Sequence, residues 1–375
     1  MRSGGIIMEQ TFFTEIVIKK VRHLKNISIP LDKNKRKHLI LTGKNGSGKT
    51  SFLEALAKYF QNMILTEEGV IDSGIFTECN SETLLKEKYE LGNFIFSYYK
   101  SEREFQVEKY KNIEKIELRD KYDITENPGA KLTKYLVDLK ATQAFTKNKD
   151  KFEKIEQWFR TFENVLKVIF EDEKLQLKFN EETFQFSICV SGREPFDFNT
   201  MSSGYAAILD IINDLIIRME AKSGLRTVFD MEGVALIDEI ETHLHLELQK
   251  KILPILINLF PNIQFIVTTH SPFILSSVNN VVIYDLENKT LVENGMKNLP
   301  YEGIVEGYFK ADRLSEELRK NFSRYKVLVS KAELSDEEYE EIDRLEYYLD
   351  EIPDYLAKEL TAEYSRLKLE FFNRR

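Results

Sequence analysis

The octapeptide GKNGSGKT at positions 43–50 constrains the fold of this chain more than any other feature, because it matches GxxxxGK[ST] at every defined position. The apolar run HLILT directly before it predicts a buried strand, and the following SFLEALAKYF has the apolar spacing of a helix. Glycines in such a loop let backbone N–H groups converge on a phosphate at the positive end of the helix. The sequence therefore predicts a phosphate-binding loop between a buried strand and a helix.

Two side chains of this loop predict how a nucleotide and its metal ion are held. Lys49 is expected to reach the β- and γ-phosphates, and the Thr50 hydroxyl is expected to bind Mg²⁺. A random match to the octapeptide in a chain of this length has odds of roughly 1% at average residue frequencies. The predicted nucleotide-binding residues are Gly43, Lys44, Asn45, Gly46, Ser47, Gly48, Lys49, Thr50 and Ser51.

An acidic pair ends an apolar run later in the chain. The residues VALI at 234–237 predict a strand that is covered on both faces, and Asp238 and Glu239 follow it directly. Ligands of open α/β sheets bind at the carboxyl ends of the strands, so both carboxylates are expected at the phosphate site. Asp238 is predicted to hold Mg²⁺, and Glu239 is predicted to deprotonate the attacking water. An acidic pair that only begins a helix is the alternative.

A histidine follows the next predicted strand. QFIVTTH at 264–270 reads as a buried strand one helix after the acidic pair, which favours His270 as a sensor of the γ-phosphate. A helix cap before Ser271 and Pro272 is the alternative for this side chain.

A serine-rich segment, MSSGY at 201–205, precedes a long apolar helix. Taken alone it is an ordinary helix N-cap. Its position between the glycine-rich loop and the acidic pair favours nucleotide contact for Ser202, Ser203 and Gly204.

In this order, GKNGSGKT, MSSGY, ALIDE and TTH resemble the Walker A, signature, Walker B and switch-histidine motifs of the ABC-type ATPase domain. The segments LKNISI, IDEIETHLHLELQ and THSPFIL are similar to the RecF, SMC and OLD-type ATPases rather than to transporters, and the resemblance covers about residues 12–290. It implies a homodimer in which the signature of one copy contacts ATP on Lys49 of the other. Residues 300–375 look similar to the tails of small bacterial ATPases encoded beside phage-defence effectors.

The chain departs from the family pattern in three places. Ser203 and Tyr205 stand where transporters usually have Gly and Gln. No Q-loop glutamine is evident, and a segment with Arg103 occupies its place. His243 and His245 fall where the D-loop should lie, and either a contact across the dimer or the start of a helix explains them.

The alternation of strands and helices predicts an α/β P-loop fold with a mostly parallel sheet. An antiparallel strand pair at 12–30, with a turn near His23 to Asn26, is expected before it, and two helices at 130–170 with a following β-hairpin are expected within it. The ATPase core is predicted to comprise residues 8–128 and 193–295, with the helical insertion and hairpin at 129–192 between them. Residues 296–375 are predicted to form a helical extension. Its sequence contains a Ser335–Glu338 capping box and an apolar stripe of Tyr339, Ile342, Leu345, Tyr348 and Ile352.

Composition limits the class of protein. Charged residues make up 31% and hydrophobic residues 42%, as in globular proteins, and no apolar run approaches the length of a membrane span. Cys79 and Cys189 form no CxxC pair, which argues against a zinc ribbon. The net charge of −9 does not indicate nucleic-acid binding. Residues 1–50, however, contain 11 Lys/Arg against 3 Asp/Glu, so a basic groove that binds nucleic acid remains an alternative to an ordinary solvated surface. A cytoplasmic protein without a membrane partner is expected.

Together these features predict an ATPase that forms a nucleotide-gated homodimer. The resemblance implies a role in sensing or processing DNA, or in controlling a separately encoded nuclease or toxin in phage defence or DNA repair. Three alternatives remain: the cytoplasmic subunit of an ABC transporter, a small-molecule kinase, and an ATP-dependent scaffold with negligible turnover.

Overall fold

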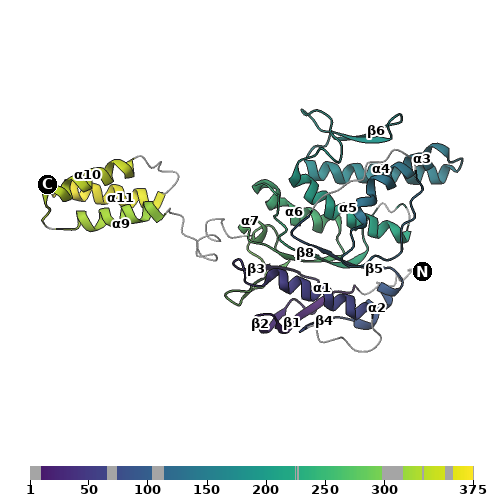
Figure 1. Cartoon of the computed structure of the whole chain (residues 1–375), viewed down its shortest axis with the longest axis horizontal. Coiled ribbons are helices and arrows are strands. Elements are labelled where there is room, and N and C mark those ends of the chain that lie inside the picture. Colours follow the sequence, from purple (N-terminus) through teal and green to yellow (C-terminus); the bar gives the residue numbers. More distant parts are fainter. Residues whose placement is uncertain are drawn as a thin grey trace, which may run out of the picture. The chain divides into compact units, whose positions relative to one another are not determined.

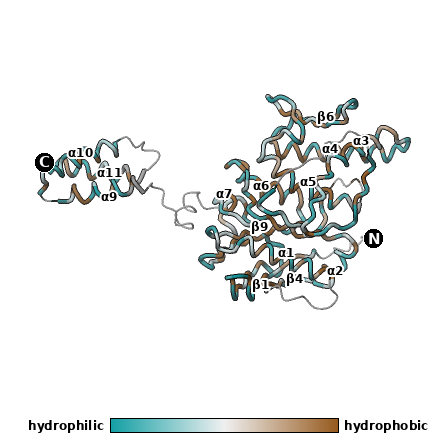
Figure 2. Tube along the Cα trace, viewed as in Figure 1, coloured by the Kyte–Doolittle hydropathy of each residue, from teal (hydrophilic) through white to brown (hydrophobic). Residues whose placement is uncertain are grey.

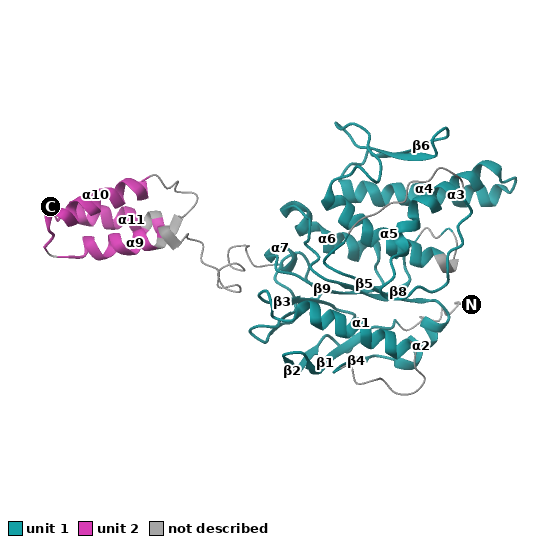
Figure 3. Cartoon of the chain, in the orientation of Figure 1, with its two compact units in different colours: residues 1–299 teal, residues 300–375 magenta. Residues whose placement is uncertain are grey.

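The computed structural model describes residues 10–65, 74–103, 114–223, 225, 228–297, 316–331, 333–350 and 358–374. The chain divides into two compact units, residues 1–299 and 300–375, and each is described by itself (Figure 3). No helix within the described ranges has both the length and the apolar character that crossing a bilayer requires.

A six-stranded sheet forms the centre of the first unit, in the order β11-β10-β3-β9-β8-β5. Hydrophobic residues are concentrated along these strands (Figure 2), and β3, β9 and β10 are buried throughout. Such continuous apolar runs are typical of parallel strands covered on both faces. The parallel strands are β3 (His38–Thr42), β5 (Phe94–Tyr99), β8 (Glu232–Ile237), β9 (Ile263–Thr268) and β10 (Val281–Asp285), and β11 (Thr290–Val292) pairs antiparallel at one edge. The predicted, mostly parallel sheet is confirmed.

One face of this sheet packs on helix α1 (Lys49–Leu65), which lies between it and a smaller antiparallel sheet (Figure 1). The smaller sheet has the order β2-β1-β4 and comprises β1 (Phe13–Val21), β2 (Leu24–Pro30) and β4 (Ile75–Cys79), followed by helix α2 (Glu82–Glu90). The strand pair is as predicted, but its turn lies earlier than expected, because Val21 already pairs with Leu24 across Arg22 and His23.

Helices cover the other face of the central sheet. These are α5 (Ser203–Ser223), α6 (Leu246–Leu259) and the short α7 (Pro272–Leu275). Beyond them lie the 3₁₀ turn η1 (Pro128–Lys131), helices α3 (Leu132–Phe145) and α4 (Lys149–Phe170), and the hairpin of β6 (Gln176–Asn180) and β7 (Gln185–Cys189) (Figure 1). The two predicted helices and the hairpin are thus present.

Buried polar bonds fasten this insertion to α5. Trp158 of α4 donates from its indole nitrogen to Glu220 of α5 at 2.9 Å, and Tyr135 of α3 donates its hydroxyl to the same carboxylate at 2.8 Å. Because a buried charge-assisted bond is costly to break, both outer helices are held in register with α5.

The second unit is a bundle of α9 (Glu316–Val329), α10 (Asp336–Asp350) and α11 (Lys358–Phe372). The predicted capping box is present: the Ser335 amide donates to Glu338 Oε2 at 3.1 Å, and the Glu338 amide donates to Ser335 Oγ at 3.3 Å. Tyr339, Ile342, Leu345 and Tyr348 of the predicted stripe pack in the core of the bundle, and Ile352 lies outside the described residues.

His38, the first residue of β3, predicts an acid-sensitive fold. Its imidazole is 2% exposed and its Nδ1 accepts from the Phe265 amide, and burial lowers its pKa to about 3. Below pH 6.5 the unfolded chain takes up a proton that the folded chain does not, so this residue is expected to remove up to ~1.4 kcal/mol of stability per pH unit until about pH 3. Urea unfolding of wild type and His38→Gln between pH 7.5 and 5 measures how the free energy of unfolding of each protein changes with pH. If this free energy falls equally steeply for both proteins, His38 is not the cause.

Candidate functional site

The sheet order brings three predicted motifs to one edge. Strand β9 lies between β3 and β8, with Ile266 aligned to Leu39 on one side and Leu236 on the other. Because the three strands are parallel, the segments after them leave the sheet side by side. The glycine-rich loop, the acidic pair and His270 are therefore neighbours, although they are up to 227 positions apart in sequence.

The glycine-rich loop has the geometry that its sequence requires. Gly48 has φ +99°, and a Cβ at this position would lie 3.1 Å from the imidazole of His23. A side chain at this position would strain the backbone, and the His23 and Leu24 side chains would have to shift to make room for it. The Lys49 ammonium donates to the carbonyls of Gly43 and Lys44 at 2.9 and 3.2 Å, inside the loop. Burial lowers the pKa of Lys49, so the loop holds a partly desolvated cation that an anion would stabilise.

Asp238 joins the loop to the sheet. Its carboxylate accepts one bond from the Thr50 hydroxyl at 2.8 Å and one from the Thr268 hydroxyl at 2.6 Å. Its side chain is almost completely buried. A carboxylate beside a threonine hydroxyl at the first turn of the helix is the oxygen donor set that Mg²⁺ prefers when phosphate oxygens and water complete its shell.

Glu239 comes next, in a strained conformation. Its φ is +44°, in the left-handed region that non-glycine residues seldom adopt, and its amide donates to Thr268 Oγ1 at 2.7 Å. Strain of this kind persists where the surroundings enforce it, which is frequent at functional sites. The side chain lines the cavity over the glycine-rich loop.

Arg103 provides part of that enforcement. Its guanidinium is buried and donates to the carbonyl of Asp238 at 3.1 Å and to that of Glu239 at 3.0 Å. The segment in the Q-loop position therefore supports the backbone of the acidic pair through an arginine.

His270 presents a nitrogen without a bond. Its amide donates to Glu241 Oε1, while its Nε2 is buried and lacks a hydrogen-bond partner among the described residues. Burial, and then the charge of Lys49, lowers the pKa of the imidazole, so it is neutral at pH 7. The neighbouring Thr269 amide donates to the Leu41 carbonyl of β3, which holds this segment beside the loop.

A cavity of about 330 Å³ lies over the loop. Its lining includes residues 45–46 and 48–51 and Glu239, and it also includes Arg22 and His23 from the β1–β2 turn, which the sequence did not single out. Within the described residues no cluster of three His, Cys, Asp or Glu side chains is placed to hold a metal. The donor set instead fits an ion shared with a nucleotide: the Asp238 carboxylate and the Thr50 hydroxyl lie beside the Lys49 ammonium, which forms no ion pair with any described residue.

The predicted signature residues lie at the start of α5. Ser202 and Ser203 are exposed at the start of α5 and are absent from the lining of the cavity. Gly204 is buried against the loop before α6, where a Cβ would lie 3.1 Å from the carbonyl of His243. Within the described parts of the chain, no hydrogen bond joins residues 202–204 to residues 43–50.

Two of the three departures from the family pattern, besides Arg103, involve Tyr205 and the histidines before α6. Tyr205 stacks on Phe170 at the end of α4, with ring centroids 4.3 Å apart, and so anchors α5 to the insertion. His245 occupies the N-cap of α6 without a side-chain cap bond, and both His243 and His245 are exposed.

Comparisons with known proteins identify a family and several relatives that this chain resembles. Residues 136–276 match the family described as "AAA domain, putative AbiEii toxin, Type IV TA system". The Septu protein PtuA of Bacillus mycoides (strain KBAB4) is 28% identical over 387 residues, which covers 90% of this chain and 50% of PtuA. The Retron Ec83 probable ATPase of Escherichia coli is 36% identical over 134 residues, 34% of this chain and 25% of that protein.

Among solved structures, an SMC head bound to the C-winged helix domain of ScpA aligns with a TM-score of 0.42 and 13% identity, over 77% of this chain and all of that one. The chain spans at most about half the length of these two curated relatives. The chain carries an AAA-like ATPase domain and is homologous to Septu PtuA, retron ATPases and RecF.

Proposed function

We propose that the chain binds ATP with Mg²⁺, hydrolyses it, and pairs with a second copy when ATP is bound. The observation that carries this proposal is a division within one chain. Lys49 and Glu239 line the cavity at the glycine-rich loop and Asp238 bonds to Thr50, whereas the exposed Ser202 and Ser203 form no hydrogen bond to that loop within the described residues. In a symmetric pair, Ser202, Ser203 and Gly204 of a second copy could contact the nucleotide on the glycine-rich loop of the first.

Each residue has a distinct part in the proposed reaction. The glycine-rich loop and Lys49 bind the phosphates, and Thr50 and Asp238 hold the metal, which when bound neutralises charge developing on the phosphate oxygens. Glu239 accepts a proton from the attacking water, and the neutral His270 donates from Nε2 to the γ-phosphate. Arg103 and Thr268 position the backbone of Glu239.

Exposed residues around the signature fit a surface that a second copy covers. Ser202, Ser203, His243 and His245 are exposed, and Leu246, the next residue, is 58% exposed. The amino-terminal end of α5 carries the positive end of the helix dipole, which would favour a phosphate presented by the partner. ATP would then stabilise the closed pair, and hydrolysis would release it.

The similarity to Septu PtuA and to retron ATPases supports a role in phage defence. We infer that the closed and open pairs differ in their contact with a separately encoded nuclease or toxin, or with DNA. The cytoplasm is where such a cycle would meet its ATP.

A mixing experiment tests the shared site. Lys49→Met removes the phosphate-binding cation, and Ser202→Arg blocks the partner's phosphate from an exposed position, so each variant alone should lose ATP hydrolysis. In an equal mixture, half of the pairs keep one intact site, and hydrolysis should recover to about one quarter of wild type. The control is Ser28→Arg, which should remain active. Ser28 is exposed on β2 and bonds to Glu15 of β1. A mixture as inactive as its components would contradict a site shared between copies.

A further inference from the structure

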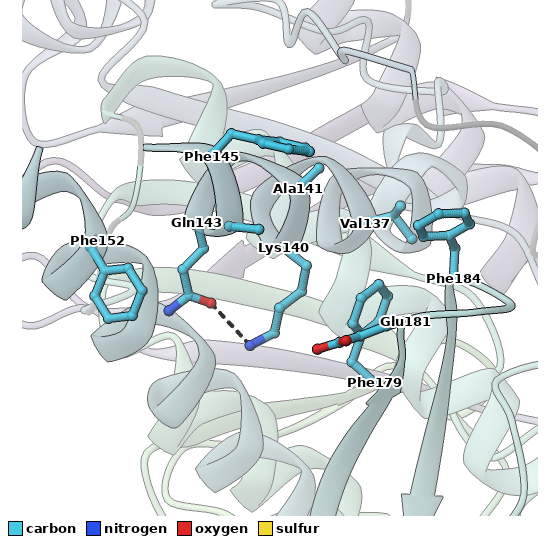
Figure 4. Close-up of a pocket in the computed structure, with 10 residues that line it drawn as sticks. Val137, Lys140, Ala141, Gln143, Phe145, Phe152, Phe179, Glu181 and Phe184 are labelled. Carbon is cyan, nitrogen blue, oxygen red and sulfur yellow. Dashed lines mark hydrogen bonds between the residues drawn. The ribbon is translucent and has the colours of Figure 1, made fainter. Parts of the chain in front are cut away.

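A second large cavity lies far from the nucleotide loop in sequence and shares no residue with it. It has a volume of about 680 Å³ and is formed by the carboxyl end of α3, the start of α4 and the β6–β7 hairpin. Its lining is mostly apolar, with four phenylalanines among three polar side chains (Figure 4). Phe145 is 82% exposed and Phe152 42% exposed, which is unusual for rings that only serve packing.

The polar side chains of this cavity carry opposite hydrogen-bonding roles. Lys140 and Gln143 extend from α3 into the space between Phe152 and the hairpin, and Glu181 faces it from the hairpin (Figure 4). The Lys140 ammonium donates to Gln143 Oε1 at 3.1 Å and lies 4.2 Å from the ring centroid of Phe159. An ammonium donor, an amide and a carboxylate acceptor between aromatic walls match the edge of a nucleobase, which carries donors and acceptors in one plane.

The hairpin keeps one of these rings in place at a conformational cost. Phe184 has φ +55°, a region that glycine adopts freely and that is strained for a bulky residue. Its ring lies 6.4 Å from that of Phe179, and both rings line the cavity. A glycine would relax this turn, so the phenylalanine is explained by its ring rather than by the backbone.

Three exposed lysines accompany the exposed phenylalanines of this cavity in the sequence. Lys147, Lys149 and Lys151 lie between Phe145 and Phe152 in sequence, are exposed, and form no ion pair with any described residue. Lys149 and Lys151 are in the first turn of α4, where a positive charge opposes the helix dipole. These charges therefore do not stabilise the helix, but they would bind the phosphates next to a base that has entered the cavity.

We propose that this cavity binds an unpaired nucleobase of a single-stranded nucleic acid. Phenylalanine rings stack on the base, Lys140, Gln143 and Glu181 bond to its edge, and the three lysines hold the adjacent phosphates. A base within a duplex is covered on both faces, so it is excluded. This proposal rests on the proposed function only in that it assigns the contact with nucleic acid to this cavity. The proposed ATP-dependent pairing does not require the cavity.

Fluorescence anisotropy with the full chain and three labelled 12-nucleotide probes tests the site: mixed-sequence DNA, the same sequence as RNA, and the DNA duplex. The single strands should bind more tightly than the duplex, and the preference between DNA and RNA identifies the physiological source. Phe145→Ala with Phe152→Ala should weaken single-strand binding between about fivefold and 100-fold. Phe184→Gly should weaken it as well, while melting no lower than wild type.

The contribution of the three lysines is measured by the salt dependence of binding. Lys147, Lys149 and Lys151 changed together to Gln should flatten the log–log dependence of affinity on salt by about 2, since each phosphate contact on a single strand contributes about 0.7. The same change at the exposed Lys25, Lys33 and Lys35 is the matched control for a basic groove in the first 50 residues, and Leu91→Ala, 53% exposed, is the control for the rings.

Three results would overturn the proposal. They are equal affinity of the phenylalanine variants and wild type, equal affinity for duplex and single strand, and loss of binding only in the Lys25, Lys33 and Lys35 control. Loss of a co-purifying protein in the phenylalanine variants, without any oligonucleotide binding by wild type, would identify a protein surface instead and equally reject it. ATP hydrolysis and ATP-dependent pairing of the same variants should remain at wild-type levels, which separates this site from the nucleotide site.

Discussion

Replacing Glu239 with glutamine is expected to lower the ATP hydrolysis rate by about 10²- to 10⁴-fold, the range that a general base contributes. The amide keeps the size of the side chain but cannot accept the proton of the attacking water. The strained backbone at φ +44° is held by Thr268 and Arg103 through main-chain atoms, so the substitution leaves these bonds in place. ATP should still bind, and the variant should accumulate as an ATP-dependent dimer, measured by light scattering after gel filtration.

The control for this variant is Glu87→Gln, an exposed carboxylate on α2 outside the cavity. It should hydrolyse ATP and remain in the open form at the end of the reaction. If Glu239→Gln stays monomeric at saturating Mg-ATP, the pairing mechanism is wrong. A wild-type chain that binds ATP tightly but turns it over no faster than Glu239→Gln would favour the scaffold hypothesis.

Replacing Asp238 with asparagine is expected to reduce hydrolysis by about 100-fold or more, because a metal ion contributes several kcal/mol to charge stabilisation in such reactions. The carboxylate accepts from Thr50 and Thr268. In asparagine one of these hydroxyls can still donate to the amide oxygen while the other turns to accept from the NH₂ group, so the fold should be retained. Raising the Mg²⁺ concentration should restore part of the activity, since the amide oxygen is a weaker ligand for the ion.

Thermal melting with and without Mg-ATP separates this effect from unfolding. Asp238→Asn should melt near wild type without ligand but gain less stability from Mg-ATP. Asp123→Asn, whose carboxylate accepts from Gln61 and Thr125 outside the cavity, should behave as wild type in both measurements. Unchanged activity and unchanged Mg²⁺ dependence of Asp238→Asn would exclude this carboxylate as a metal ligand.

The fold could be predicted from sequence because its signals are local. The apolar runs that became β3, β8 and β9 each lead directly into a polar motif, and parallel strands bring those motifs to one edge of the sheet. The Ser335–Glu338 capping box also depends on residues three apart. Such patterns need no knowledge of the tertiary structure.

The remaining features depend on contacts between distant residues. Arg103 donates to the main-chain carbonyls of Asp238 and Glu239, which are 135 and 136 positions away. Any residue has such a carbonyl, so the sequence does not predict which one a side chain will contact. The Thr268 hydroxyl bridges Asp238 and the Glu239 amide from a neighbouring strand, which depends on sheet order. Tyr205 looked like a departure from the signature, and only the position of Phe170 shows it as a packing residue.

Helix α4 has a mechanical consequence that arises from its two ends. It is 22 residues long, or about 33 Å, with Phe152 in its first turns and Phe170 at its last residue, stacked on Tyr205 beside the signature serines. If a nucleic acid bound at Phe152 tilts this helix, Tyr205 at the other end would move as well, so closure around ATP would be coupled to that ligand only while it is bound. Since such coupling is reciprocal, whatever factor ATP applies to affinity for that ligand must also be applied by the ligand to affinity for ATP.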